Sequence, residues 1–471
     1  MYRRLLLGLV ALTLTSCVSI PSPHTPKTSK AAQPATTTTT PAAHPAASPD
    51  AGAVGATCLP EAADSYQRPF AATAPWNVPV CGLPADPRSA DWTNRFYYYA
   101  HYNQYMGGDP TQATDSASYT VMFGLDANPV NDFSVAVYDA KDATTTTRVF
   151  QRTGWNGLMN IGNGASIPWN PSWRASTGSD ALLVIVDHTT GHEWTLWGLV
   201  QSTYGLPLND TQCWGWIPFS YRSGTDLCVG SANMSKTANG TSPVNDNTYA
   251  GNNPTNRGSG IDEYALLATP QEASTGQIRH ALAMPVFNTM TGGPGQVCTA
   301  TQLNTDAFGS TCGNAVAPAG QFEGVAGTTH GCGNNPPAAA LTNTTYRQTT
   351  IPEGTRFALH LSDQDIENWL NSRAYTGQKR VTAKAFAVAL VNYGWFITDT
   401  SCYGADFQVS GSANPTTAAA WRADGITGDG RDLLQGLITK TNIWTIAPPT
   451  NHCTNGTTSK AACPADTITY P

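Results

Sequence analysis

The chain has 471 residues, of which 40% are hydrophobic and only 12% are charged, and its formal net charge is -7 at pH 7. Because no cluster of Lys and Arg is present to neutralise phosphates, this composition argues against nucleic-acid binding. The many Thr, Asn, Ser, Gly and Trp residues are typical of exported β-rich proteins that handle polar, neutral ligands.

The N-terminal sequence MYRRLLLGLVALTLTSC has the pattern of an export signal, because two arginines precede an apolar run that is too short to cross a bilayer. Its last four residues, LTSC, resemble a bacterial lipobox, in which cleavage precedes a cysteine that then carries lipid. We expect residues 1–17 to be a lipoprotein signal peptide and Cys17 to be lipidated, which would place the protein in the bacterial cell envelope. An ordinary secretory signal with a chance cysteine is the alternative, and it also exports the chain.

Residues 18–56 consist mainly of Pro, Thr, Ala and Ser and carry almost no large apolar side chains. Such a segment cannot bury enough surface to offset its ordering entropy, so we expect a disordered tether. Residues 57–471 are long enough for a β-rich ectodomain with a substantial core. This ectodomain forms either one domain or two packed β subdomains with a break near residue 290, and we expect it to be a monomer.

The cysteine count agrees with export. Of the eleven cysteines, Cys17 is assigned to lipid, which leaves ten, an even number that favours disulfides outside the cytoplasm. No CxxC motif occurs, so a structural zinc site is disfavoured. The expected local pairs, whose connectivity does not follow from sequence, are Cys58–Cys81, Cys213–Cys228 and Cys453–Cys463.

Short segments rich in β-branched and aromatic residues, bounded by Gly, Asn, Pro or Asp, predict strands along most of the ectodomain. Three segments predict helices instead, and in one of them Ser362 is suited to cap the helix with Asp365 three residues later. These patterns predict a mainly β fold with a β-sandwich or jelly-roll-like core, a few peripheral helices and disulfide-stabilised loops. The predicted strands are 119–127, 133–140, 181–187, 193–200, 278–286, 356–361 and 394–400, and the predicted helices are 88–106, 362–375 and 382–393.

The segment VDHTTGHEWTLW, residues 186–197, is the most informative stretch of the chain. A three-residue hairpin loop ending in Gly191, which tolerates the left-handed conformation, would place Asp187 opposite Glu193. Their Cβ atoms would then lie roughly 5 Å apart, and retaining glycosidases hold two carboxyl groups about 5–5.5 Å apart. Trp194 or Trp197 could offer a flat face to a sugar ring.

Two other readings of this hairpin stay open. A two-residue loop would pair Glu193 with His188 and would remove the carboxylate pair. Alternatively, the segment is a solvated hairpin tip whose charged residues maintain solubility.

Further candidate residues lie on other predicted strands. His280 should point inward, either as a satisfied core histidine or, if that face lines a cleft, as a proton shuttle. Asp399 should also be buried and would require a partner, for which Arg356 is a candidate, either at a site or in a structural ion pair. Trp76 in APWN could stack on a sugar, although tryptophan beside proline is more often a packing residue.

No cofactor is expected, because the chain has no HExxH motif, no GxSxG elbow and no Gly-rich phosphate loop followed by Lys. An acidic segment with Asp262, Glu263 and Glu272 could bind Ca²⁺ through loop oxygens, although its spacing matches no known calcium loop. His188 and His192 could ligate a metal across the hairpin.

Several segments along residues 70–425 resemble, in their order, a family of exported bacterial proteins that are mostly uncharacterised and often suspected of acting on carbohydrate. The resemblance implies a carbohydrate ligand but no particular reaction. A central histidine of that family corresponds to His330 in GTTHGC, which makes His330 a candidate substrate contact. The segments that carry the resemblance are APWNVPV, VDHTTGHEWTLW, GQIRHAL and YGWFITDT.

We therefore expect a carbohydrate-active protein whose partner is a polysaccharide or envelope glycan, and whose contact with membrane is through its lipid alone. The leading hypothesis is a polysaccharide hydrolase in which Asp187 and Glu193 act as acid, base or nucleophile, with His280 as an auxiliary proton carrier. A polysaccharide lyase is the first alternative and would need a cation such as Arg279 or Arg356 to neutralise a uronate. The second alternative is a non-catalytic glycan-binding or envelope-structural lipoprotein, which does not require these groups to converge in one groove.

Overall fold

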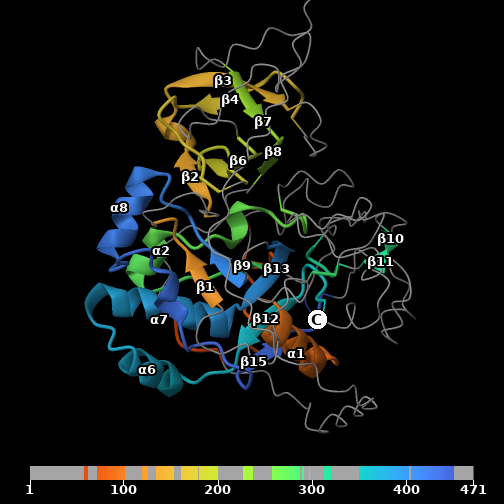
Figure 1. Ribbon diagram of the computed structural model, residues 1–471, viewed down its shortest axis with the longest axis vertical. Coiled ribbons are helices and arrows are strands. Elements are labelled where there is room, and N and C mark those ends of the chain that lie inside the picture. Colours follow the sequence, from red (N-terminus) through yellow and green to blue (C-terminus); the bar gives the residue numbers. More distant parts are fainter. Residues whose placement is uncertain are drawn as a thin grey trace, which may run out of the picture. The chain divides into compact units, whose positions relative to one another are not determined.

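Figure 1 shows the computed structural model of the chain, coloured from the N-terminus to the C-terminus. The described residues form sheets of six, four, three and two strands and five helices, so the predicted mainly β fold is confirmed. All of them belong to the unit that spans residues 48–471. The described residues are 58–61, 70, 72–100, 119–125, 134–152, 161–178, 180–199, 226–236, 257–286, 289–290, 296–297, 312–313, 315–319, 350–401, 405–449 and 470.

The predicted signal peptide, the lipidation site Cys17 and the predicted tether all lie outside the described residues. None of the helices in the described part of the chain is both long enough and apolar enough to cross a membrane.

The six-stranded sheet is mixed, because two of its strand pairs are parallel and three are antiparallel. Strand β13, which reads WFITDT, is buried along its first four residues, as expected for a strand that is covered on both faces. The order across the sheet is β1 (Tyr119–Met122), β14 (Ala405–Gln408), β9 (Leu282–Val286), β13 (Trp395–Thr400), β12 (Arg356–Leu359) and β15 (Ile443–Thr445).

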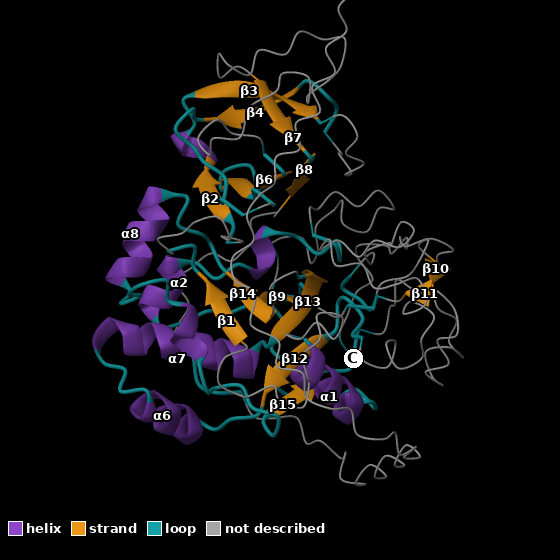
Figure 2. Ribbon diagram, in the orientation of Figure 1, coloured by secondary structure: helices purple, strands orange, loops and turns teal. Residues whose placement is uncertain are grey.

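Helices cover this sheet, and Figure 2 shows α7 running beside it. Helix α7 enters β13 through Gly394, whose φ of +69° suits glycine and whose added Cβ would lie 1.9 Å from the Phe357 carbonyl oxygen. Ser362 and Asp365 form the predicted capping box at the start of α6. The helices are α1 (Ser89–Tyr99), α2 (Pro270–Thr275), α6 (Asp363–Ser372), α7 (Gly377–Asn392) and α8 (Pro415–Ala423).

The four-stranded and three-stranded sheets share one hydrophobic cluster, to which both contribute buried side chains such as Ile185, Trp194 and Trp169. The opposite face of β5 packs against Tyr264 and Leu267. The four-stranded sheet has the order β2 (Ala136–Asp139), β5 (Leu183–Asp187), β6 (His192–Trp197) and β8 (Ser231–Lys236), and the three-stranded sheet has the order β4 (Ala165–Trp169), β3 (Thr145–Gln151) and β7 (Asp226–Val229). The remaining pair in the described residues is β10 (Gln296–Val297) with β11 (Cys312–Gly313), and the short 3₁₀ helices are η4 (Ala140–Asp142), η8 (Tyr264–Leu266) and η10 (Arg431–Leu434).

Each of the seven predicted strands and three predicted helices overlaps an observed element of the same type. The disulfide between Cys58 and Cys81 is confirmed, and Cys228 is also disulfide-bonded. A sandwich or jelly-roll arrangement of the core as a whole is not confirmed, because the largest sheet contains parallel pairs and is covered by helices.

Candidate functional site

The hairpin between β5 and β6 has a longer loop than the sequence suggested. Asp187 pairs with His192, and Val186 pairs with Glu193. The Asp187 carboxylate accepts hydrogen bonds from the backbone N–H groups of Thr189 and Thr190, at 2.8 and 3.1 Å, and this turn lengthens the loop by one residue. The expected cross-strand pair of Asp187 and Glu193 is therefore wrong.

The register places these two carboxyl groups on opposite faces of the hairpin, because neighbouring positions in a strand point to opposite sides. Asp187 is partly exposed at the strand end, whereas Glu193 is fully buried. Although partial burial acts in the other direction, hydrogen bonds from Thr190 and Thr189 lower the pKa of Asp187. A retaining glycosidase cannot use two carboxyl groups placed in this way.

The buried Glu193 faces other acids. Burial, followed by the nearby charges of Asp262 and Glu263, raises the pKa of Glu193 well above its ordinary value. Neither Glu193 oxygen accepts a hydrogen bond of normal geometry from the described residues, and the polar groups facing it are the Asp262 carboxyl and the Tyr264 backbone N–H. Glu193 therefore lies in a closed environment that disfavours its charged form, out of reach of a polysaccharide.

The other predicted catalytic groups are dispersed. His280 is buried, with Nε2 at 3.2 Å from Glu272 and Nδ1 at 2.8 Å from the Ala281 carbonyl oxygen, which makes it a satisfied core histidine. Glu272 also completes the capping box of α2, so both of its roles are structural. Asp399 is partly exposed and accepts a hydrogen bond from the Thr400 backbone N–H at 2.9 Å.

The predicted partner of Asp399 is engaged elsewhere. Arg356 is buried and donates to the main-chain carbonyls of Tyr393, Pro75 and Val78 at 2.9, 2.9 and 2.6 Å. The expectation that Arg356 pairs with Asp399 is therefore wrong. Arg356 instead fastens the APWN segment to β12.

The predicted aromatic platforms are largely covered. Trp76 is fully buried and packs edge to face on Phe70 with ring centroids 4.9 Å apart, so it is a packing residue. Trp194 is 9% exposed and lies in the core between the two smaller sheets. Trp197 is half-buried and its indole donates to Asp180. His330 lies outside the described residues.

A cleft of about 660 Å³ opens beside the hairpin. Its volume is in the range of about 300–1,000 Å³ that is usual for small-ligand sites. Most of its lining side chains carry hydroxyl or amide groups, and the hairpin contributes Val186 and the exposed His188. The others are Val137, Tyr138, Asp139, Lys141, Asp142, Ser172, Trp173, Tyr264, Thr269, Gln271, Ser410, Asn414, Pro415, Thr416 and Thr417.

The walls of the cleft are fixed by hydrogen bonds. Asn414 accepts from the Thr416 backbone N–H at 3.0 Å, which caps α8, and donates to the Val137 carbonyl at 2.7 Å, which ties α8 to β2. Tyr138 and Trp173 stack with ring centroids 4.9 Å apart and stiffen the same wall. The cleft is therefore preformed.

The charge in the cleft is nearly balanced. Lys141 Nζ lies 2.7 Å from one carboxylate oxygen of Asp139, and the other oxygen accepts from the Lys141 backbone N–H at 2.9 Å. Because both oxygens of Asp139 are engaged, Asp139 and Asp142 do not provide the two free carboxylates that glycoside hydrolysis requires. The cleft suits a neutral polar ligand better than a strongly charged one.

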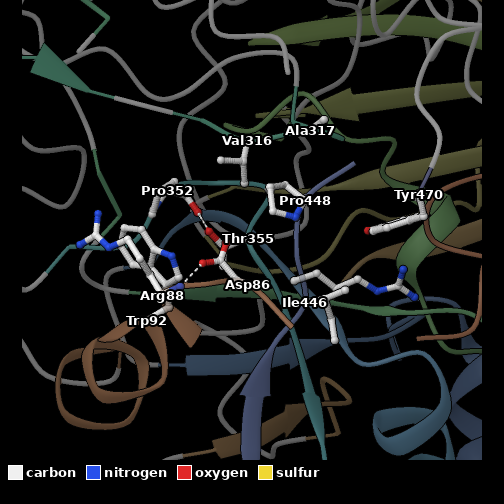
Figure 3. Close-up of a pocket in the computed structure, with 12 residues that line it drawn as sticks. Asp86, Arg88, Trp92, Val316, Ala317, Pro352, Thr355, Ile446, Pro448 and Tyr470 are labelled. Atoms are coloured by element: carbon white, nitrogen blue, oxygen red, sulfur yellow. Dashed lines mark hydrogen bonds between the residues drawn. The ribbon is translucent and has the colours of Figure 1, made fainter. Parts of the chain in front are cut away.

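A second, smaller cavity of about 160 Å³ lies near the start of α1. In Figure 3, Tyr470 lies across this cavity from Asp86 and Thr355. Burial raises the pKa of Asp86, and its carboxyl accepts from the Arg88 backbone N–H at 2.6 Å. The guanidinium of Arg88 covers the ring of Trp92 at 4.3 Å, so this ring offers no free face there. The volume is below the range usual for ligand sites, which is about 300 Å³ and more.

Within the described part of the chain, no group of three or more His, Cys, Asp and Glu side chains is arranged to hold a metal ion. His192 pairs with Asp187 and not with His188, so the cross-strand pairing that the two-histidine alternative requires is not formed. Comparison with known protein families, curated proteins and solved structures finds no match to this chain.

Sequence reasoning missed most of the cleft. Among the residues that line the cleft, only His188 is identified as a candidate from the sequence, either as a metal ligand or as a partner of Glu193. Tyr138, Trp173, Asn414 and Thr416 come from segments far apart along the chain, and no local spacing connects them. The clustering of Asp262 and Glu263 was visible in sequence, but their partner Glu193 was assigned to the wrong face.

Proposed function

We propose that this protein is an exported, lipid-anchored glycan-binding protein that holds a neutral polysaccharide in the cleft beside the β5–β6 hairpin without cutting it. The observation that carries the proposal is the preformed cleft of about 660 Å³, lined by hydroxyl and amide groups and nearly balanced in charge. Sugars present many hydroxyl groups, which Ser, Thr, Asn and Gln side chains satisfy as donors and acceptors.

The positions of the candidate catalytic residues support binding over cleavage. Asp187 and Glu193 face opposite sides of the hairpin, and His280 is bound to Glu272 in the core. A hydrolase built on these groups would need them to converge on one bond.

A lyase receives less support for a similar reason. Arg356 is committed to three main-chain carbonyls, and Arg279 donates to Gln277 at 2.9 Å and lies 3.4 Å from Glu61. Neither arginine lines the cleft, so neither is placed to neutralise a uronate there.

The export features complete the proposal. The LTSC motif is consistent with lipidation at Cys17, and residues 18–56 would then hold the ectodomain away from the membrane surface. We place the four-stranded and three-stranded sheets, which share one hydrophobic cluster, in a β-sandwich that supports one wall of the cleft. The glycan partner would belong to the cell's own envelope or to its surroundings.

Calorimetric titration of the full chain with neutral glucan, mannan and xylan hexasaccharides and with a hexauronate tests the proposal. We expect binding to a neutral hexasaccharide, and assays for new reducing ends and for unsaturated uronates should detect no product. His188→Ala in the hairpin and Gln271→Ala in α2, which both alter the lining of the cleft, should each weaken binding about three- to tenfold, the effect of losing one hydrogen bond. Gln364→Ala on α6, away from the cleft, is the matched control and should bind as the wild type does.

The other outcomes overturn the proposal. New reducing ends would identify a hydrolase, and unsaturated products would identify a lyase. Binding that is unchanged in both cleft variants would place the glycan site elsewhere.

A further inference from the structure

A buried group of acids joins the four-stranded sheet to the six-stranded sheet. Glu193 comes from β6, and Asp262 and Glu263 come from the segment before η8, and all three side chains are at most 1% exposed. Asp180, which also faces Glu263, adds a fourth carboxyl from the loop before β5. Arg257 is the cation among them, and its Nη2 lies 3.1 Å from Glu263 Oε1. We call these five residues the acid junction.

Arg257 connects the acid junction to the six-stranded sheet. Its guanidinium donates to Thr398 of β13 at 3.4 Å and to Gln408 of β14. It also donates to the Glu263 carbonyl at 2.9 Å, which fixes the segment before η8. The connection to β13 and β14 is therefore made through neutral groups and does not depend on the protonation of Glu193.

One of the two connections to the four-stranded sheet, that between Glu193 and Asp262, depends on a proton, whereas the other, from Ser235, does not. Ser235 of β8, which pairs with Glu193 across the ladder, donates its hydroxyl to Asp262 at 3.1 Å. The other Asp262 oxygen accepts from the Ala265 backbone N–H at 3.0 Å, so the Asp262 carboxyl serves as an acceptor at both oxygens. Glu193 and Asp262 can therefore share a hydrogen bond only while Glu193 carries a proton to donate.

We propose that the acid junction is a proton-dependent latch beside the glycan cleft. While Glu193 is protonated, the latch holds in place the side of the cleft that contains Tyr264. Loss of that proton releases this side of the cleft. The latch rests on the proposed function, since it regulates the same cleft. Glycan binding would therefore weaken when the buried Glu193 carboxyl loses its proton.

Two contacts couple the acid junction to the cleft. Tyr264, which lines the cleft, directly follows Glu263 in the chain, and Val186, which also lines it, pairs with Glu193. Both Tyr264 and Val186 belong to one hydrophobic cluster. A displacement of the segment before η8 therefore moves the wall of the cleft.

Loss of the Glu193 proton creates a buried carboxylate that faces the Asp262 and Glu263 carboxyls. Arg257 is already paired with Glu263, and Ser235 donates to Asp262, so the Tyr264 backbone N–H is the donor that faces the Glu193 carboxylate. An unpaired buried charge is costly, and separation of β6 from the segment before η8 admits water and relieves it.

The test compares the full-length wild type with Glu193→Gln, which mimics the protonated acid, and with Glu367→Gln as the matched control. Glu367 is a half-buried acid of α6 that pairs with Arg380 and Lys384 and does not line the cleft. Hydrogen exchange of residues 257–266, corrected for the intrinsic pH dependence, is measured without glycan from about pH 6 to about pH 9. Affinity for the best-binding neutral hexasaccharide is measured over the same range. Should Glu193→Gln fail to fold, Asp262→Asn replaces it, because an amide can donate to the ionised Glu193 and accept from the protonated one.

In the wild type and in Glu367→Gln, exchange of residues 257–266 should increase with pH. Affinity should fall about tenfold for each pH unit once the proton is lost, in proportion to the protonated fraction. In Glu193→Gln the pH dependence of both quantities should be much weaker than in the wild type, and the part that remains comes from Glu263, whose pKa burial raises to about 7. Equal pH dependence of exchange in the wild type and in Glu193→Gln overturns the latch. If exchange behaves as expected but no hexasaccharide binds, the latch is supported and the proposed function is the part that fails.

Discussion

Helix α8 forms one wall of the cleft, and we expect Trp421 to be the side chain that holds it there. Trp421 is fully buried, packs edge to face on Phe123 with ring centroids 4.8 Å apart, and donates its indole N–H to the Ser410 carbonyl at 2.7 Å. Ser410 itself lines the cleft, as do Asn414 and Thr416 at the start of α8. Loosening of this attachment should therefore change both stability and glycan binding.

The size of the effect follows from what Trp421→Ala removes. Truncation of a buried aromatic side chain to alanine costs about 3–5 kcal/mol of unfolding free energy, and the lost hydrogen bond to Ser410 adds about 1 kcal/mol. Trp421→Phe retains most of the ring contact with Phe123 but loses the N–H donor, so its cost should be about 1–2 kcal/mol. The difference between the two variants isolates the contribution of packing.

Guanidinium unfolding followed by circular dichroism, with variants compared at equal slope, measures these costs. Calorimetric titration with the neutral hexasaccharide shows whether binding follows the same order, with Trp421→Ala weaker than Trp421→Phe. A loss of less than about 1 kcal/mol of unfolding free energy in Trp421→Ala would refute the reasoning, because removal of a well-packed indole costs more than this. Unchanged hexasaccharide affinity in a destabilised Trp421→Ala would separate α8 from the binding site.

Two further changes test the fold and its charges. Gly394→Ala should lower the free energy of unfolding by about 3 kcal/mol or more, because the new Cβ would lie 1.9 Å from the Phe357 carbonyl oxygen. Gly82→Ala, whose new Cβ meets no atom within 4 Å, should lower it by only about 1 kcal/mol because of the positive φ. Similar guanidinium midpoints for the two variants would contradict this prediction. Burial raises the pKa of Glu263 to about 7 and that of Asp406 to about 6, so the folded chain keeps protons that the unfolded chain releases near about pH 4. The unfolding free energy should therefore fall as pH rises through this window, and a guanidinium midpoint that increases from about pH 5 to about pH 7 would show that the acids are not held neutral.

Much of the fold could be predicted from local sequence, because the apolar residues that bury each predicted strand lie within that strand. WFITDT begins with three apolar residues and LVIVD with four, both contain β-branched residues, and both are strands. Strands such as β8, which reads SANMSK, were missed because Ser231, Asn233 and Ser235 are buried polar residues and carry no hydrophobic alternation. The pairing of such strands is set by hydrogen bonds to other segments, which the sequence does not display.

The candidate site was harder to predict for a different reason. The hairpin register depended on one side-chain contact, the turn in which Asp187 accepts from Thr189 and Thr190. A shift of one residue in loop length moves every following side chain to the other face of the strand. The cleft, in turn, is assembled from segments as distant as residues 137–142 and 410–417, and no spacing in the chain indicates that they meet.

The hairpin register explains why Glu193 is buried at all. Trp194 and Leu196 point into the core between the two smaller sheets, and burial of each such side chain is worth about 1.5–3 kcal/mol. This gain fixes the strand, and strand alternation then directs Glu193 to the opposite face, toward Asp262. That face is closed by Tyr264 and Leu267, so the carboxyl has no access to water and keeps its proton instead. The packing that secures β6 in the sheet thus also places an acid at the back of the cleft, where its proton can influence binding.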